Sequence, residues 1–141
     1  MKSNLLFIFF IICKIVNAQS EIVIKEAWAR PAAKHANSAL YFSIHNNGEI
    51  PDTLISANSK SADITEVHET FKRENNQMGM HALKFIAIPS KSVIKLKPGE
   101  FHIMLIDLKK DLKLGDFIKA TIQFKNSGAL KIKAIVKDSG E

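Results

Sequence analysis

A chain of 141 residues, of which 46% are hydrophobic, is long enough to bury one core. Its formal net charge of +6 falls to about +4 once Lys2 and Lys14, which lie in the first eighteen residues, are set aside. With one Tyr, one Trp and no interleaving of aromatic and basic residues, the sequence argues against nucleic-acid binding. The spread of the lysines is typical of a solvated surface, and the alternative is attraction to acidic partners or membrane headgroups.

The first eighteen residues have the layout of a secretory signal peptide. A short basic start at residues 1–4 precedes an apolar run at residues 5–12, and the segment ends with the small residue Ala18. The apolar run is too short to span a bilayer, which takes about 20 residues. We expect cleavage after Ala18 and export to the periplasm, while Lys14 leaves open an uncleaved anchor. The mature form, residues 19–141, is then not membrane-spanning.

The one cysteine of the chain, Cys13, lies inside this segment. It is preceded by Ile11 and Ile12, whereas a lipoprotein signal has small residues at this place. The mature chain is therefore expected to have neither a disulfide nor the thiolate that a blue-copper electron-transfer centre requires. Its stability must come from an ordinary hydrophobic core.

Short alternating or β-branched segments fill the rest of the chain, separated by turn residues such as Asn46-Asn47-Gly48. Their regular spacing, without a long amphipathic helix or a linker, predicts one all-β domain at residues 19–141, a sandwich or Greek-key barrel. We expect about nine strands, at residues 22–29, 39–45, 53–57, 64–71, 80–88, 92–96, 102–108, 117–124 and 130–136.

Methionine and histidine concentrate in one window of the sequence. Every methionine except Met1, and three of the five histidines, lie between His68 and Met104. Thioether sulfur and imidazole nitrogen form a soft ligand set that prefers Cu(I) to harder ions. Taken singly, a methionine is usually core filler and a strand histidine is usually structural, so the prediction of a metal site depends on this concentration.

Strand alternation brings the candidate ligands to one face. Residues i and i+2 of a strand point to the same side, so His102 and Met104 project together while Ile103 packs on the other side. A loop joins the strand of His68 to Met80, and antiparallel neighbours lie within about 5 Å of each other. We therefore expect a four-coordinate copper site made of His68, Met80, His102 and Met104. Cu(I) is the expected ion, and Cu(II) is an alternative that would need extra ligands.

The spacing of these residues resembles the motif of the periplasmic copper chaperones of the PCuAC family. In that motif, written H(M)x₁₀Mx₂₁HxM, the first histidine falls on His68, the methionine on Met80 and the final HxM on residues 102–104. Residues 27–31, Ala-Trp-Ala-Arg-Pro, also look like the opening strand of that family. The resemblance covers about residues 22–137.

This resemblance implies a cupredoxin-like Greek-key β-sandwich with an exposed copper site. It also implies delivery of copper to a respiratory acceptor, usually the dinuclear copper centre of a cytochrome c oxidase subunit. Whether a second copper chaperone supplies or reduces the metal stays open. The optional methionine of the motif is Glu69 here. Met78 and His35 stay open as additional ligands, and His81 is expected to point away from Met80.

Catalytic motifs are absent from the sequence, which has no HExxH, no GxSxG and no phosphate-binding Gly-rich loop. We expect no enzyme, but a chaperone that binds Cu(I) and passes it to an acceptor by ligand exchange. Two alternatives stay open. One is a periplasmic copper buffer or sequestration protein without a dedicated recipient, and the other is a metal-free β-sandwich interaction module in which the methionines merely pack.

Overall fold

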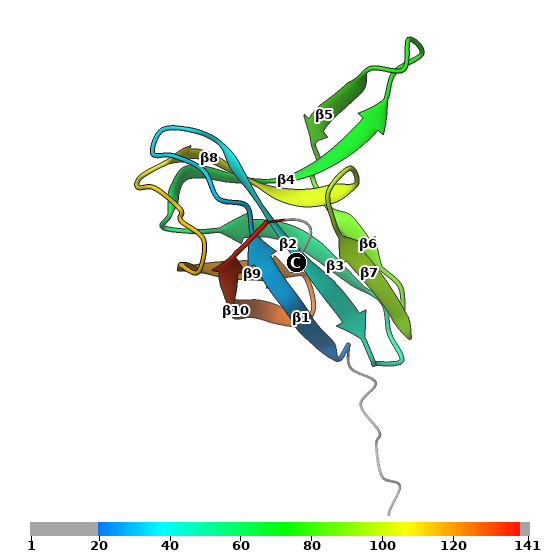
Figure 1. Ribbon diagram of the computed structural model, residues 1–141. Helices are drawn as coiled ribbons and strands as arrows, with labels where there is room; N and C mark the ends of the chain where they lie inside the picture. Colours follow the sequence, from blue (N-terminus) through cyan, green and yellow to red (C-terminus); the bar gives the residue numbers. More distant parts are fainter. Residues whose placement is uncertain (1–19, 139–141) are drawn as a thin grey trace, which may run out of the picture.

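A computed structural model describes residues 20–138 of the protein (Figure 1). The expected signal peptide, with Cys13, lies outside the described residues. The described part contains ten strands and no helix, and therefore no helix that could cross a membrane. The strands are β1 (Ile22–Ala29), β2 (Ser38–Asn46), β3 (Asp52–Asn58), β4 (Ala62–Lys72), β5 (Met78–Ala82), β6 (Ile86–Ile88), β7 (Ser92–Leu96), β8 (Phe101–Leu108), β9 (Phe117–Phe124) and β10 (Gly128–Val136).

The strands form one hydrogen-bonded sheet that curls round a common core. Their order is β5-β4-β8-β2-β1-β10-β9-β3-β6, and β7 adds to β2. The pairing of β1 with β10 is parallel, and the other pairings among the described strands are antiparallel. Strands β4, β8 and β2 contribute to the same core as β10, β9 and β3 (Figure 1). The prediction of an all-β fold is confirmed.

Alternating burial explains why these segments form strands. In β9, Ile118, Ala120, Ile122 and Phe124 are buried, and the residues that alternate with them face outward. In β8, Ile103 and Leu105 enter the same core. Burying a side chain of this size stabilises the fold by about 1.5–3 kcal/mol. The apolar alternation visible in the sequence therefore sets which face of each strand remains for other uses.

One predicted strand is two strands in the structure. The sequence suggests a continuous strand at residues 80–88, but β5 ends at Ala82 and β6 begins at Ile86. The two segments have different partners, because β5 pairs with β4 and β6 pairs with β3. The backbone N–H of Leu83 donates to the carbonyl of Val67 at 2.8 Å where the chain changes direction. The alternation of apolar residues in the sequence does not indicate such a change of partner strand.

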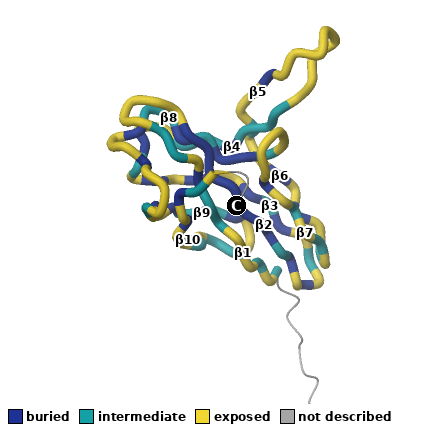
Figure 2. The backbone as a smooth tube through the Cα atoms, viewed as in Figure 1, coloured by how far each residue is buried: buried dark blue, intermediate teal, exposed yellow. Residues whose placement is uncertain are grey.

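The β4–β5 hairpin projects from the body of the molecule (Figure 1), and most of its residues are exposed (Figure 2). Strand β5 lies at the edge of the sheet and is hydrogen-bonded only to β4. The ring of Phe71 crosses β5 so closely that a Cβ on Gly79 would lie 2.7 Å from its Cζ atom. Glycine at this position lets the ring lie across β5 near the tip of the hairpin.

A buried carboxylate ties the start of the described chain to two strands. Asp52, only 2% exposed, accepts hydrogen bonds from Ser20 Oγ and from the backbone N–H of Thr53. It also accepts from the backbone N–H groups of Asn126 and Ser127 and from Ser127 Oγ, all in the β9–β10 turn. Burial alone would raise the pKa of Asp52, but these hydrogen bonds together outweigh it and lower the pKa to about 2.

Candidate metal centre

The pairing of β4 with β8 brings two histidines face to face. His68 and His102 are Cα partners in this antiparallel pair, and the centroids of their rings lie 5.7 Å apart. Met104 follows two residues after His102 and therefore projects to the same side. Val67 and Ile103 point to the opposite side, where they are buried in the core. The alternation thus separates a packed face from the face that carries the candidate ligands.

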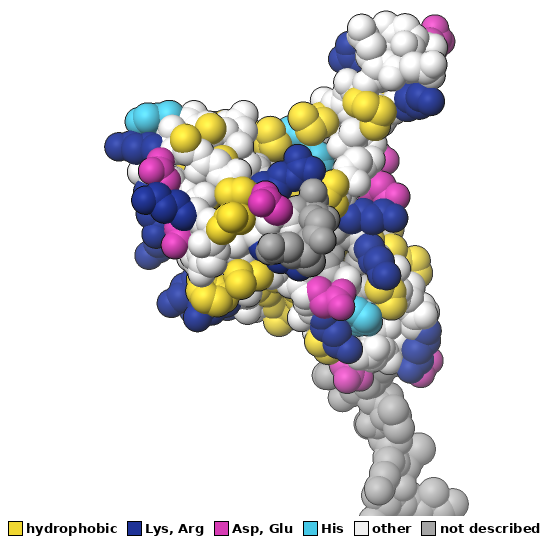
Figure 3. Space-filling view, viewed as in Figure 1, with side chains coloured by type: hydrophobic (Ala, Val, Ile, Leu, Met, Phe, Trp, Pro, Cys, Tyr) yellow, Lys and Arg dark blue, Asp and Glu magenta, His cyan; other side chains and the backbone are white. Residues whose placement is uncertain are grey.

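Met80 reaches this face from the projecting hairpin. Met80, His102 and Met104 line one hollow of about 380 Å³. His68 does not line the hollow but lies beside it, next to His102. Histidine and apolar side chains adjoin where the hairpin leaves the body (Figure 3). The structure thus brings the four predicted residues to one place on the surface.

The exposed fraction differs among the candidate ligands and rises toward the hairpin. His102 is 3% exposed, Met104 is half-buried, and Met80 is 54% exposed. Met80 belongs to the edge strand β5, whereas the other three residues belong to strands with neighbours on both sides. The site is anchored in the body of the molecule and opens toward the hairpin.

His102 is held as a neutral ring with one free nitrogen. Its Nδ1–H donates to the carbonyl oxygen of Glu100 at 3.0 Å, because a carbonyl can only accept. The proton on Nδ1 leaves the lone pair of Nε2 available. Burial lowers the pKa of His102, against the opposing effect of the bond to Glu100. Neutral imidazole is the form that binds metal ions.

His68 also offers one unpaired nitrogen. Its Nε2 lies 2.8 Å from Oε2 of Glu66, a contact in which the ring N–H donates to the carboxylate. The other nitrogen, Nδ1, is buried and has no hydrogen-bond partner among the described residues. Buried polar atoms without a partner are rare in folded proteins. An acceptor lone pair of this kind, beside His102, fits a ligand to a metal ion.

The described residues contain no cluster of three or more His, Cys, Asp and Glu side chains that could hold a metal ion. Histidine and carboxylate side chains alone therefore make no three-ligand site in this part of the chain. A set of four donor atoms around the two histidines requires the thioethers of Met80 and Met104. Such a donor set suits a soft ion.

Comparison with known proteins places the chain in a family. Residues 22–136 match the family described as "Putative lipoprotein LpqE-like". The chain belongs to this family. The "Putative lipoprotein Lxx21020" of Leifsonia xyli subsp. xyli is 29% identical over 117 residues, and the match covers 83% of this chain and 70% of that one. The "Uncharacterized protein RP573" of Rickettsia prowazekii is 31% identical over 115 residues, covering 78% and 63%.

Two solved structures show the same fold as this LpqE-like chain. The apo PCuAC domain from PmoF1 is 27% identical with a TM-score of 0.71, covering 82% of this chain and 92% of that domain. The copper-bound PCuAC domain from PmoF2 is 26% identical with a TM-score of 0.69, covering 85% and 95%. The resemblance to PCuAC domains, and the cupredoxin-like fold that it implies, are confirmed.

Other residues that the sequence singled out lie around the hollow rather than in it. Met78 is on the same face of β5 as Met80 but two residues further out, is 59% exposed and does not line the hollow. Glu69 lies on the other face of β4, where its Oε2 is 3.6 Å from Nε2 of His81. His81 therefore points away from Met80, as the alternation predicts. Its ring lies 5.0 Å from that of Phe71.

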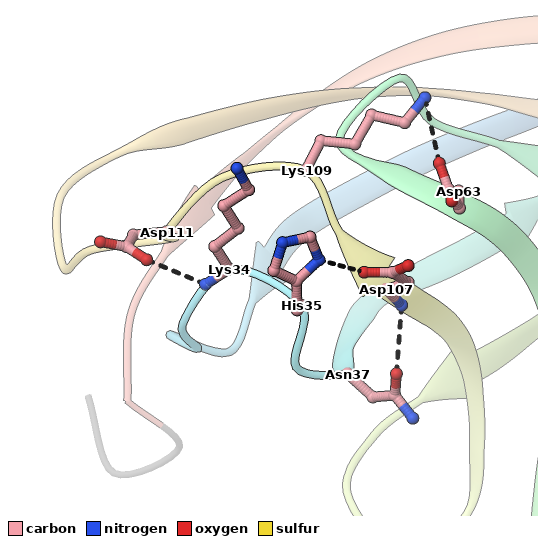
Figure 4. A network of polar contacts seen from close by, with 7 residues as sticks. All are labelled: Lys34, His35, Asn37, Asp63, Asp107, Lys109 and Asp111. Carbon is pink, nitrogen blue, oxygen red and sulfur yellow. Dashed lines mark hydrogen bonds and ion pairs between the residues drawn. The ribbon is translucent and has the colours of Figure 1, made fainter.

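His35 is engaged elsewhere on the surface. Its Nδ1 lies 2.9 Å from Oδ1 of Asp107, at the end of β8 (Figure 4). Asn37, from the same loop, accepts from the backbone N–H of Asp107 and also lines the hollow. The loop thus borders the candidate site through Asn37, while the ring of His35 points toward the carboxylate.

Among the lining residues of the hollow that the sequence analysis did not predict for the site are an aromatic and a charged one. Tyr41 and Arg30 both line it, and the guanidinium of Arg30 lies 5.8 Å from the centroid of the Tyr41 ring. The Tyr41 ring is 6.4 Å from that of His102 and 4.5 Å from that of Trp28. Burial raises the pKa of Tyr41. The alternation of β2 puts Tyr41 on the opposite side from Phe42, but only the pairing of β2 with β8 brings it to this face.

Proposed function

We propose that this protein is a periplasmic copper chaperone that binds Cu(I) through His68, Met80, His102 and Met104. The observation that carries the proposal is the unpartnered Nδ1 of His68 beside the neutral ring of His102, on the same face as two thioethers. The similarity to the copper-bound PCuAC domain from PmoF2 supports copper as the metal. The apolar segment before Ala18 supports export.

The charge of the site favours the monovalent ion. Four neutral ligands leave the charge of the metal uncompensated, and Arg30 adds a positive charge to the same hollow. Repulsion between Arg30 and the metal is twice as large for Cu(II) as for Cu(I). Cu(II) would therefore need extra ligands, and the nearby carboxylate of Glu66 is already bonded to His68.

The gradient of exposure suggests the order of transfer. Met80 lies half-exposed on an edge strand, so an acceptor can replace its sulfur first. His102 is buried and hydrogen-bonded, so it holds the ion until an acceptor ligand is in place. Ligand exchange of this kind breaks no covalent bond in the protein, and the proposed role is not enzymatic. The expected acceptor is the dinuclear copper centre of a cytochrome c oxidase subunit, with a second copper chaperone as a source of the metal.

A transfer experiment tests the chaperone role. Cu(I)-loaded residues 19–141 are mixed with the apo form of the copper-binding domain of the oxidase subunit, and the metal on each protein is measured after separation. We expect transfer that saturates with acceptor concentration and whose rate exceeds the rate at which Cu(I) dissociates spontaneously from the protein. Transfer at the dissociation rate, and equally to an unrelated apo copper protein, would contradict the chaperone role and indicate a copper buffer.

Glu66 is expected to tune the site through His68. Its carboxylate accepts a hydrogen bond from Nε2–H of His68 and so favours the tautomer of the ring that has its lone pair on Nδ1. We expect Glu66→Gln to weaken Cu(I) binding by about tenfold, the lower end for loss of such a partner of a metal ligand. The matched control is Glu69→Gln, which removes the same charge on the other face of β4 and should leave affinity unchanged. Competition against a chromophoric Cu(I) chelator measures both, and equal losses would rule out the role of Glu66.

A further inference from the structure

The β9–β10 hairpin concentrates positive charge that the proposed copper site does not use. Between Phe117 and Val136 the sequence has four lysines and no acidic residue, and so carries +4 of the formal net charge of +6. The even-numbered residues of β9, such as Ile118 and Ile122, face the core. The lysines of the two strands, Lys119, Lys131 and Lys133, therefore face outward.

The register of the hairpin puts like charges side by side. Lys119 and Lys133 are Cα partners, and Lys131 is the partner of Thr121. Like charges directly opposite each other destabilise a strand pair. The ion pairs of lysine among the described residues join Lys91, Lys97 and Lys109 to carboxylates, and none involves these three lysines. The fold leaves their charge uncompensated.

These lysines surround a hollow that contains no carboxylate. Lys60, from the turn between β3 and β4, joins Lys119, Lys131 and Lys133 in lining a space of about 680 Å³. The buried polar side chain in its wall, Ser59, donates its hydroxyl to the carbonyl of Lys119. No buried side-chain donor in the wall is thereby left to select a small anion, and lysines act as mobile point charges. This arrangement suits a surface with many anionic groups better than one bound anion.

Exposed apolar side chains border the same lysines. Phe117 and Ile135 are partners at one end of the hairpin and face outward, with Phe117 52% exposed. The Nζ of Lys133 lies 4.3 Å from the centroid of the Phe117 ring. Leu114, in the preceding turn, is 60% exposed. Apolar side chains beside flexible lysines are typical of surfaces that lie at a membrane interface.

We propose that this lysine face, made of Lys60, Lys119, Lys131, Lys133 and Phe117, docks the protein on an anionic phospholipid surface. The lysines meet the headgroups, and Phe117 enters the boundary between headgroups and acyl chains. The hollow with the candidate copper ligands shares no lining residue with the lysine face. The lysine face and this hollow lie on different strands around the same core, so docking leaves the candidate copper site open to an acceptor.

Co-sedimentation with vesicles tests this docking. Residues 19–141, which include every described strand and the whole core, are spun with vesicles of phosphatidylcholine alone or mixed with phosphatidylglycerol. We expect binding only to the mixed vesicles, weakened by salt. Each lysine near an anionic surface strengthens binding by about fivefold, so Lys119→Gln with Lys131→Gln should weaken it by about 25-fold. The variants are checked for unchanged thermal unfolding.

The matched control is Lys72→Gln with Lys84→Gln, which removes the same charge from other surface positions. An equal loss in both double variants would overturn the proposal, because net charge alone would then explain binding. Equal binding to phosphatidylcholine vesicles would also overturn it. So would displacement by inorganic phosphate beyond that by chloride at equal ionic strength, which would indicate a small-anion site. Met80→Leu with Met104→Leu should bind vesicles normally, which separates this docking from the copper proposal.

Discussion

Replacing Met104 by leucine is expected to weaken Cu(I) binding by roughly 100-fold. A four-ligand structural zinc site in a small peptide contributes about 10–16 kcal/mol of binding free energy, so each ligand contributes about 3 kcal/mol, and we expect a similar share for each ligand here. Leucine preserves the size and apolar character of the side chain, and such exchanges usually cost less than about 1.5 kcal/mol in stability. The loss of affinity then reports the loss of sulfur rather than of the fold. His102→Ala should have an effect of similar size.

The two methionines of β5 supply the matched comparison for this result. Met80→Leu should also weaken binding by roughly 100-fold. Met78→Leu removes an equally exposed thioether from the same face of the same strand but outside the hollow. It should therefore change the Cu(I) affinity by less than about threefold, as expected for a residue that does not contact the metal. A chromophoric Cu(I) chelator in competition measures all four variants. Equal losses for Met78 and Met80 would contradict the assigned ligand set.

Asp52→Asn is expected to lower the free energy of unfolding by about 2–3 kcal/mol at neutral pH. Burial opposes the charge of Asp52, but the hydrogen bonds it accepts lower its pKa from 3.8 to about 2. A difference of this size between the unfolded and folded states corresponds to about 2.5 kcal/mol. Asparagine presents N–H groups to backbone donors in the β9–β10 turn, so part of the network is lost as well.

The contribution of Asp52 to the free energy of unfolding should depend on pH. Because the folded-state pKa is depressed, the stabilisation is complete above about pH 4 and is lost as the pH falls toward about 2. Urea unfolding across this range should show a steeper decline for the wild-type protein than for Asp52→Asn. Asp63→Asn serves as the control, since Asp63 forms only an exposed ion pair with Lys109 and should contribute under about 1 kcal/mol. Parallel pH profiles for wild type and Asp52→Asn would refute this role.

The sequence analysis predicted much of the framework because alternation and turns are local. The bounds of β1, β7 and β9 agree with the expected strands. The shared face of His102 and Met104 follows from the same periodicity. By contrast, the break between β5 and β6 depends on which strand each segment pairs with, and that pairing is non-local.

The surroundings of the candidate ligands could be predicted only in part. The proximity of His68 to His102 was expected, but their direct pairing depends on the register of β4 against β8. Glu66 lies two residues before His68 and therefore shares its face, but the contact between its carboxylate and the ring is visible only in the structure. Arg30 reaches the hollow from the loop after β1, and no sequence period indicates that contact.

X-ray absorption at the copper edge of Cu(I)-loaded residues 19–141 tests the central claim most directly, because it identifies the atoms bound to the metal. The proposed site predicts a mixed shell of sulfur and nitrogen, with the sulfur contribution reduced in Met80→Leu and again when Met104→Leu is added. A shell of nitrogen and oxygen alone, or a sulfur contribution unchanged in both variants, would contradict the assignment of His68, Met80, His102 and Met104.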